Sequence, residues 1–136
     1  SKSFRRLKAQ KVKTRLKFTS SNSESYNQPF SLSELMESLK KAHDASAGPD
    51  DIHYQFLKHL LEPSLTVLLE IFNDLWITGN VPKIWKEATV IPIPKPGKDS
   101  AGPTNYFRPI SLTSCVCITM ERMINSRPVW YLETTI

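Results

Sequence analysis

The stretch Ala88-Thr-Val-Ile-Pro-Ile-Pro94 marks the point at which the hydrophobic pattern of this 136-residue chain changes. It is short, rich in β-branched residues and interrupted by prolines, which fits an edge strand better than a central one. Lys95-Pro-Gly-Lys-Asp99 has the composition of a turn, and we expect residues 106–113 to form the returning strand. The sequence therefore predicts a β-hairpin in the second half of the chain.

Apolar residues recur at helical spacing in three segments that precede this hairpin. Ser31-Leu-Ser-Glu34 has the spacing of a capping box and opens a helix predicted over residues 31–43. Ala47-Gly-Pro-Asp50 breaks the pattern and supplies a turn together with an N-cap for a second helix. The third helix is expected to have Pro63 in its first turn and to stop at Gly79.

A final helix is predicted over about residues 115–127 from its apolar spacing. We expect Pro128 to end this helix, because an interior proline removes a backbone hydrogen bond. Helices, a hairpin and a further helix together predict a small α+β fold. A chain of this length has room for one domain. We place that domain at residues 26–136, after a basic, Ser/Asn-rich tail or linker at residues 1–25.

The positive charge of the chain is concentrated at its N-terminus. Lysines and arginines outnumber aspartates and glutamates by 18 to 13, which gives a net charge of +5. Eight of the basic residues lie within residues 1–17, which contain no acid: Lys2, Arg5, Arg6, Lys8, Lys11, Lys13, Arg15 and Lys17. Such a tail either binds phosphate backbones through counterion release or serves as a solvated linker or nuclear-import signal.

Composition excludes several classes of protein. With 40% hydrophobic and 23% charged residues, the chain resembles an ordinary globular protein and not a collagen or a coiled coil. No apolar run approaches the roughly 18 residues of a membrane-spanning helix. We therefore expect an intracellular protein, in the cytoplasm, the nucleus or both, with no membrane partner. Cys115 and Cys117 are too few for a disulfide scaffold and are expected to be buried thiols.

The sequence contains no residue set with the spacing of a catalytic or metal site. Asp50 and Asp51 form a carboxylate pair that suits a divalent cation, but at a helix start we expect them to act as caps. The histidines His43, His53 and His59 share no spacing that would put two imidazoles on one helical turn. We therefore assign no catalytic residue and no metal ligand.

Three basic residues of the hairpin are candidate phosphate contacts. Lys95 and Lys98 lie at its predicted tip, where they either touch a nucleic-acid backbone or form an ordinary exposed turn. Arg108 carries a forked, permanently charged donor that suits phosphate, and it lies within an apolar segment. A buried structural ion pair is the alternative interpretation of Arg108.

Seven segments, covering about residues 26–133, resemble the start of the reverse transcriptase domain of non-LTR, jockey-like LINE retrotransposons. They are Pro29-Phe-Ser-Leu-Ser-Glu-Leu35, His43-Asp-Ala-Ser-Ala-Gly-Pro-Asp50, Phe72-Asn-Asp-Leu-Trp-Ile-Thr-Gly-Asn-Val-Pro82, Trp85-Lys-Glu-Ala-Thr-Val-Ile-Pro-Ile-Pro-Lys-Pro-Gly-Lys-Asp99, Arg108-Pro-Ile-Ser-Leu-Thr-Ser-Cys115, Glu121-Arg-Met-Ile-Asn-Ser-Arg127 and Val129-Trp-Tyr-Leu-Glu133. The resemblance implies the fingers portion of a right-hand RNA-directed DNA polymerase, whose fingers hold the template and the incoming nucleotide.

The resemblance also implies roles for individual residues. Gly48, Pro49 and Asp50 match the family's Gly-Pro-Asp motif on the template side. Arg108 matches an arginine that lies near the triphosphate in related polymerases. By the same likeness, the lysines at the hairpin tip line the nucleic-acid path. The implied partners are an RNA template, a DNA primer, and the palm and thumb of the same polymerase.

Catalysis in this family uses magnesium ions held by palm aspartates, two of them in an aromatic-x-Asp-Asp turn. That turn occurs nowhere in the 136 residues. We therefore expect an incomplete polymerase fold, and a polypeptide that alone has no polymerase activity. Two alternatives remain: a small, non-enzymatic nucleic-acid-binding protein, and a translated remnant of an inactive element.

The chain departs from the family pattern at four positions. Asp51 stands where many relatives have glycine, and Phe107 looks like an extra residue that would shift the faces of a strand by one. Ile118 replaces a lysine, which removes a possible phosphate contact. Pro128 replaces a leucine, at a cost of about 3 kcal/mol if the helix continues through it.

Overall fold

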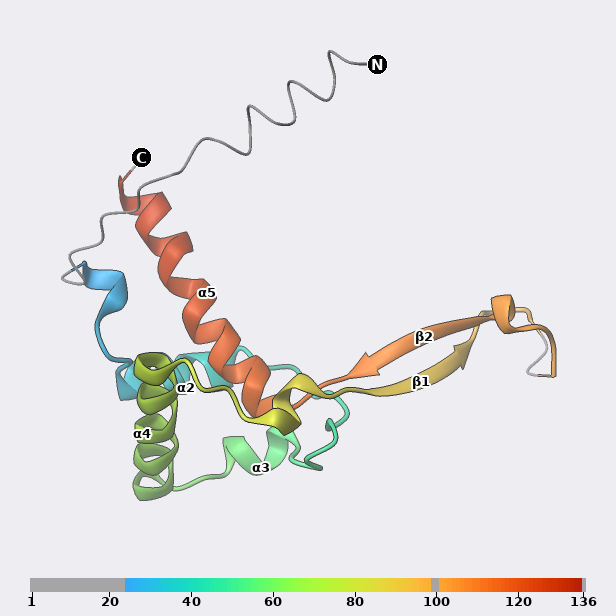
Figure 1. Ribbon diagram of the computed structural model, residues 1–136, viewed down its shortest axis with the longest axis horizontal. Helices are drawn as coiled ribbons and strands as arrows, with labels where there is room; N and C mark the ends of the chain where they lie inside the picture. The colour runs from blue at the N-terminus through green and yellow to red at the C-terminus, as the bar shows by residue number, and fades with distance from the viewer. Residues whose placement is uncertain (1–23, 99–100, 136) are drawn as a thin grey trace, which may run out of the picture.

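The computed structural model describes residues 24–98 and 101–135, and its elements follow the predicted order (Figure 1). The α-helices are α2 (Leu32–Lys40), α3 (Tyr54–Lys58), α4 (Glu62–Thr78) and α5 (Cys115–Thr135). The strands are β1 (Thr89–Pro94) and β2 (Phe107–Leu112), and short 3-10 turns are η1 (Ser25–Asn27), η2 (Lys83–Lys86) and η3 (Thr104–Tyr106). This mixture of helices and a hairpin confirms the α+β prediction. The eight basic residues of the predicted tail lie outside the described residues.

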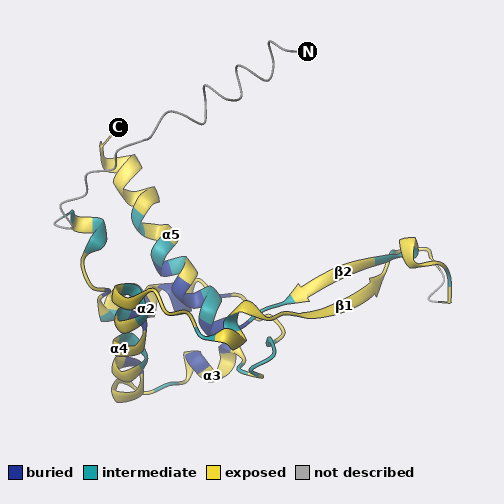
Figure 2. Ribbon diagram, in the orientation of Figure 1, coloured by how far each residue is buried: buried dark blue, intermediate teal, exposed yellow. Residues whose placement is uncertain are grey.

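Side chains from all four of these α-helices meet in one apolar core, and the hairpin projects away from it (Figure 1). The core consists of Phe30, Leu35, Leu39, Ala42, Tyr54, Leu57, Leu65, Phe72, Cys115, Val116, Met120 and Met123. Figure 2 shows the buried positions gathered where the helices come together, whereas both strands and the last turns of α5 are exposed. The molecule therefore has a helical body and a hairpin that projects from it.

The ends of α2 and α4 follow the local signals that predicted them. The Ser31 hydroxyl accepts a hydrogen bond from the Glu34 N–H at 3.3 Å, and the Glu34 carboxylate accepts one from the Ser31 N–H at 2.7 Å, which completes the capping box. Pro63 lies in the first turn of α4, and Gly79 ends that helix with a left-handed φ of 70°. α2 ends at Lys40, slightly before the predicted boundary.

Asp50 does not cap α3, so that prediction is wrong. The helix begins at Tyr54, directly after His53. Asp50 Oδ1 accepts a hydrogen bond from the N–H of Ile52 at 3.3 Å instead. Asp51 adopts a left-handed φ of 56°, which a right-handed helix cannot include. The chain therefore completes a turn at this aspartate before the helix can start.

β1 and β2 pair in a continuous antiparallel register, from Thr89 opposite Leu112 to Pro94 opposite Phe107. The described residues contain this one two-stranded sheet. The pairing is not interrupted by a bulge, so the strand accommodates Phe107 as an ordinary member of the ladder. The hairpin matches the prediction closely, with strand boundaries about one residue from the expected ones.

Three prolines lie in the paired strands of the hairpin without breaking its ladder. The N–H of Lys95 donates to the carbonyl of Tyr106 at 2.8 Å, which continues the ladder beyond the strands. In an antiparallel pair, residue pairs that exchange two hydrogen bonds alternate with pairs that exchange none. Counting from this bond, Pro92, Pro94 and Pro109 all fall on pairs that exchange none. Their missing N–H groups therefore remove no bond between the strands.

α5 continues through Pro128 to Thr135, so the prediction that this proline ends the helix is wrong. A proline inside a helix loses one backbone hydrogen bond and crowds the preceding turn, at a cost of about 3 kcal/mol. The turns beyond it have exposed apolar side chains, such as Trp130 at 59% and Val129 at 53%. Packing of these turns against the core therefore does not explain why the helix persists.

Arg127 ties α5 to the N-terminal part of the described chain. Its guanidinium donates to both carboxylate oxygens of Glu34, at 2.8 and 3.1 Å, and to three backbone carbonyls of residues 26–29. It also lies 4.1 Å from the centroid of the Phe30 ring. These charge-assisted contacts fix the turn of α5 directly before Pro128. Beyond the proline, the Tyr131 ring packs edge-on against Tyr26, with the ring centroids 5.5 Å apart. We attribute the continuation of the helix to these contacts on both sides of Pro128.

Asp51→Gly is expected to stabilise the chain, because glycine adopts a left-handed φ without the clash of a Cβ atom. Asp51→Ala is the matched comparison, since alanine keeps the Cβ and loses the polar side chain that tolerates this conformation. We expect the glycine variant to be more stable than the alanine variant by about 1 kcal/mol. Urea denaturation measures the difference, and equal stability would show that the backbone at position 51 relaxes to another conformation.

The Glu34–Arg127 pair is expected to make stability depend on pH. Burial acts to raise the pKa of Glu34, but hydrogen bonds from Arg127 and Ser31, together with the Arg127 charge, outweigh it and hold the pKa below its ordinary value. A carboxylate with a lowered folded-state pKa stabilises the fold above its unfolded pKa, and this stabilisation is lost as the pH falls through the folded pKa.

We therefore expect Glu34→Gln to lower the free energy of unfolding at neutral pH, by an amount that shrinks as the pH falls below about 4. Urea denaturation of wild type and variant between neutral pH and about pH 3 measures this gap. A gap that does not change with pH would contradict the expectation.

Candidate nucleic-acid interface

Arg108 lies exposed on the hairpin, so the alternative of a buried ion pair is wrong. The register places it directly opposite Ile93, with Ile110 opposite Ile91. Opposite residues and alternate residues along a strand share a face of the sheet. Arg108 therefore shares its face with three isoleucines that are 40–43% exposed. Within the described residues it forms no ion pair, which leaves its guanidinium available to a ligand.

Lys95 and Lys98 lie at the tip of the hairpin, as predicted. The Lys95 ammonium donates to the backbone carbonyl of Asn105 at 2.8 Å, which holds this side chain against the opposite arm of the tip. The Lys98 ammonium lies 4.9 Å from the centroid of the Tyr106 ring. Both lysines thus contact the segment that leads directly into β2 and Arg108.

The structure brings these three cations to the distal end of the hairpin. Lys95 and Tyr106 are joined by a backbone hydrogen bond, and Arg108 follows two residues later. Figure 1 shows that this end of the hairpin points away from the helical body. A basic cluster at the end of a projecting arm can reach a phosphate backbone without interference from the body.

Gly48, Pro49 and Asp50 lie at the other end of the hairpin, beside the junction of β2 and α5. A Cβ atom at Gly48 would lie 2.4 Å from the carbonyl carbon of Thr113 and 2.5 Å from the nitrogen of Ser114. Asp50 Oδ2 accepts a hydrogen bond from the Ser114 hydroxyl at 2.5 Å. The Gly-Pro-Asp loop therefore packs against the backbone at the root of the hairpin.

The two groups of predicted site residues are not brought together. Arg108 and Ser114 are six positions apart, which corresponds to about 20 Å along an extended strand. The Asp50 carboxylate is engaged with Ser114 and with the N–H of Ile52. The basic cluster is thus the part of the predicted site with free polar groups, and the loop at residues 48–50 is part of its support.

Ser114 is a site residue that the sequence does not single out. Its hydroxyl accepts a hydrogen bond from the N–H of Cys117 at 3.3 Å, so it caps the N-terminus of α5, and it is fully buried. A serine directly before an apolar helical pattern is a recognised N-cap signal, and this part of its role was available from sequence. Its partner Asp50 was not, because it lies 64 residues away.

The two cysteines are poor nucleophiles at neutral pH. Cys115 is fully buried, and burial raises the pKa of its thiol. Burial, followed by the nearby Glu121 carboxylate, raises the pKa of Cys117 to about 11. The prediction of a buried thiol is confirmed for Cys115, and Cys117 is partly buried.

No group of three or more histidine, cysteine, aspartate or glutamate side chains in the described ranges is arranged to hold a metal ion. The three histidines are exposed. None of the helices described here has the length and hydropathy needed to cross a bilayer.

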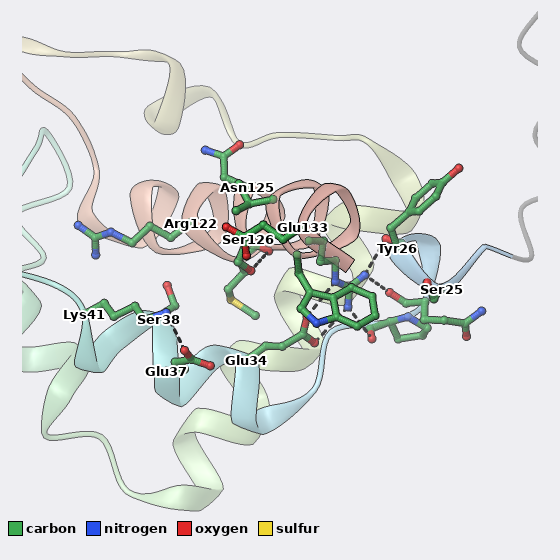
Figure 3. Close-up of a pocket in the computed structure, with 16 residues that line it drawn as sticks. Ser25, Tyr26, Glu34, Glu37, Ser38, Lys41, Arg122, Asn125, Ser126 and Glu133 are labelled. Atoms are coloured by element: carbon green, nitrogen blue, oxygen red, sulfur yellow. Dashed lines mark hydrogen bonds and ion pairs between the residues drawn. The ribbon is translucent and has the colours of Figure 1, made fainter. Parts of the chain in front are cut away.

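A pocket of about 840 Å³ lies between η1, α2 and the second half of α5, and no hairpin residue lines it (Figure 3). Its charged side chains are largely paired. Glu34 contacts Arg127 at 2.8 Å, and Glu37 contacts Lys41 at 2.6 Å. Hydrogen bonding to Lys41 and its charge hold the pKa of Glu37 below the ordinary value. Because four of the six charged side chains that line it form these two ion pairs, we assign this pocket no chemistry.

No protein-family model matches the chain, but it is similar to individual proteins. The probable RNA-directed DNA polymerase from transposon BS of Drosophila melanogaster is 35% identical over 100 residues, or 73% of this chain. The RNA-directed DNA polymerase from mobile element jockey is 37% identical over 65% of the chain in Drosophila melanogaster, and 32% identical over 79% in Drosophila funebris. The resemblance to jockey-like reverse transcriptases is confirmed.

The similarity to jockey polymerases includes the candidate site. A match of 108 residues within 136 must contain residues 29–108 wherever it begins. It therefore includes the Gly-Pro-Asp loop and the basic cluster at the hairpin tip. The chain spans 11%, 9% and 12% of the lengths of the three relatives, about a tenth of each. For this chain, therefore, polymerase activity and the partners of a whole polymerase can only be proposed.

Gly48→Ala is expected to lower the free energy of unfolding by about 2 kcal/mol or more, because its Cβ would overlap backbone atoms that cannot rotate away. Gly97→Ala is the matched control: Gly97 has a left-handed φ of 74° and no atom within 4 Å of an added Cβ. Gly97→Ala should lower the free energy of unfolding only by the strain of a left-handed alanine, about 1 kcal/mol. Urea denaturation compares the two, and a smaller loss for Gly48→Ala than for Gly97→Ala would contradict the close contact.

Proposed function

We propose that this chain supplies the fingers segment of a retrotransposon RNA-directed DNA polymerase, in which the end of the hairpin contacts phosphate. The observation that carries this proposal is the exposed Arg108 guanidinium on a projecting hairpin, close to Lys95 and Lys98. The similarity to jockey polymerases supports it, because the matched residues include this cluster. The partners would be an RNA template, a DNA primer and the incoming nucleotide, together with the palm and thumb of the polymerase.

The chemistry of the hairpin face suits a nucleotide. Arginine presents parallel N–H groups that match two phosphate oxygens, and it stays charged at any relevant pH. The isoleucines on the same face offer an apolar surface for a sugar or base. Arg108 is held in a paired strand and precedes Pro109, so the position of its backbone is well defined. These features support contact with the triphosphate or with the template backbone.

We further propose that the chain alone does not catalyse polymerisation. The two-magnesium mechanism needs aspartates grouped around the ions. The carboxylates available here do not fit that requirement, because Asp50 is bonded to Ser114 and the neighbouring Asp51 is exposed to solvent. The magnesium ions would be held by the palm of a whole polymerase. We therefore assign no catalytic residue and derive no chemical step for this chain.

The template-side role of Gly48, Pro49 and Asp50 rests on resemblance alone. The close contact of Gly48 and Asp50 with the root of the hairpin is better evidence for a structural role than for contact with nucleic acid. The basic residues of the N-terminal tail would add affinity that depends on salt and not on sequence. A non-enzymatic nucleic-acid-binding protein is the second candidate, favoured by the same exposed cations.

Arg108→Ala is expected to weaken binding of the full chain to an RNA–DNA primer–template duplex by about tenfold, the effect of losing one charge-assisted contact. It should also reduce the slope of log affinity against log salt by about 1. Fluorescence anisotropy at several salt concentrations measures both. Lys83→Ala is the matched control, because it removes an exposed charge from η2.

The binding titration, together with a primer-extension assay, distinguishes the candidate functions. Weaker binding with Arg108→Ala, and with a Lys95→Ala/Lys98→Ala double variant, supports the hairpin as the interface. Primer extension that requires magnesium and is catalysed by the purified chain would contradict the proposed lack of activity. If deletion of residues 1–17 abolishes binding and Arg108→Ala changes nothing, the hairpin has no such role, and a remnant with a basic tail is the better account.

A further inference from the structure

The hairpin is attached to the helical body only at its two ends. No residue of β1 is buried, and along β2 only the terminal residues Phe107 and Leu112 are partly covered. The two strands contact chiefly each other (Figure 1). The direction of the hairpin is therefore decided at its roots, where the chain enters β1 from η2 and leaves β2 for α5.

The root between β2 and α5 is clamped by the loop that precedes α3. The Ser114 hydroxyl donates to Asp50 Oδ2 at 2.5 Å and accepts from the Cys117 N–H at 3.3 Å. One buried side chain thus links the loop, the end of the hairpin and the start of α5. Gly48 packs directly on the backbone of the same junction.

The loop is itself closed by local hydrogen bonds, so it can act as a firm support. The N–H of Asp51 donates to the Gly48 carbonyl at 3.0 Å. The second oxygen of the Asp50 carboxylate accepts from the N–H of Ile52 at 3.3 Å. The Cys115 thiol lies 3.9 Å from the carbonyl oxygen of Ser46 on the other side of the junction. One oxygen of the carboxylate is therefore held by Ile52 while the other binds Ser114.

We propose that Asp50 is a positioning residue, which through Ser114 sets the angle at which the hairpin leaves the body. A small rotation at this root is amplified along the arm. Arg108 lies about 20 Å from Ser114 along the strand, so a rotation of about 15° would move it by about 5 Å. This inference deepens the proposed function, because it assigns to the Gly-Pro-Asp loop the placement of the arginine that meets phosphate.

The angle of the hairpin is measured directly by the distance between two spin labels on the full chain. One label is attached at Glu70→Cys on α4 and the other at Thr104→Cys near the hairpin tip, both exposed positions. Cys117→Ser removes the partly buried thiol from the background, and Cys115 is fully buried. Pulsed electron paramagnetic resonance then gives the distribution of distances.

Asp50→Ala and Ser114→Ala are each expected to shift or broaden this distribution by about 5 Å or more, because Thr104 lies farther from the root than Arg108. The double variant should change it no further than either single variant, because both remove the same bond. Asp50→Asn retains an acceptor and should restore most of the wild-type distribution. Asp44→Asn is the matched control. Asp44 lies in the same loop between α2 and α3, but its carboxylate bonds Gln55 and does not contact the hairpin root.

A residue that only stabilises the fold would lower the free energy of unfolding and leave the distance distribution of the folded chain unchanged. That result, in whichever of the two alanine variants folds, would overturn the proposal. A parallel measurement of binding to the RNA–DNA duplex tests the proposed phosphate contact independently of the positioning role. A shifted distribution together with unimpaired binding by Arg108→Ala would retain the positioning role and reject the phosphate contact.

Discussion

The contact between Gly48 and the backbone of Thr113 and Ser114 is the constraint on which the rest of the structure depends. It joins the loop after α2 to the point where the sheet ends and α5 begins. Side chains could not mediate this contact, because the backbones approach too closely for even one Cβ atom. The loop, the hairpin and the longest helix therefore share a single junction, and the bond from Ser114 to Asp50 completes it.

A second junction, at the fourth turn of α5, depends on charge. The Arg127 guanidinium donates to the Glu34 carboxylate and to backbone carbonyls of residues 26–29. Its position one residue before Pro128 means that the strongest anchor of the helix lies beside its weakest turn. α5 is thus held at its first turn by backbone packing and at its fourth by an ion pair.

The features that could be predicted from sequence are those decided by neighbouring residues. The capping box at Ser31 and Glu34, the stop at Gly79 and the proline-bearing hairpin each depend on residues within a few positions. The two errors have the opposite origin. Asp50 binds a serine 64 residues away, and Arg127 binds a glutamate 93 residues away, so both local expectations were overridden by distant partners. Within the site, the exposed position of Lys95 and Lys98 could be predicted, whereas the bond between Asp50 and Ser114 at the hairpin root could not.

The spacing of the hairpin prolines affects whether another strand can pair with the exposed edge of β1. In pairs that exchange no hydrogen bonds between strands, backbone N–H groups point outward to the free edges. On β1 these outward positions are Val90, Pro92 and Pro94, so two of the three lack a donor. An incoming strand would find too few donors to extend the sheet. The β1 edge of the arm is thereby protected from edge-to-edge aggregation, while the faces of the hairpin stay open.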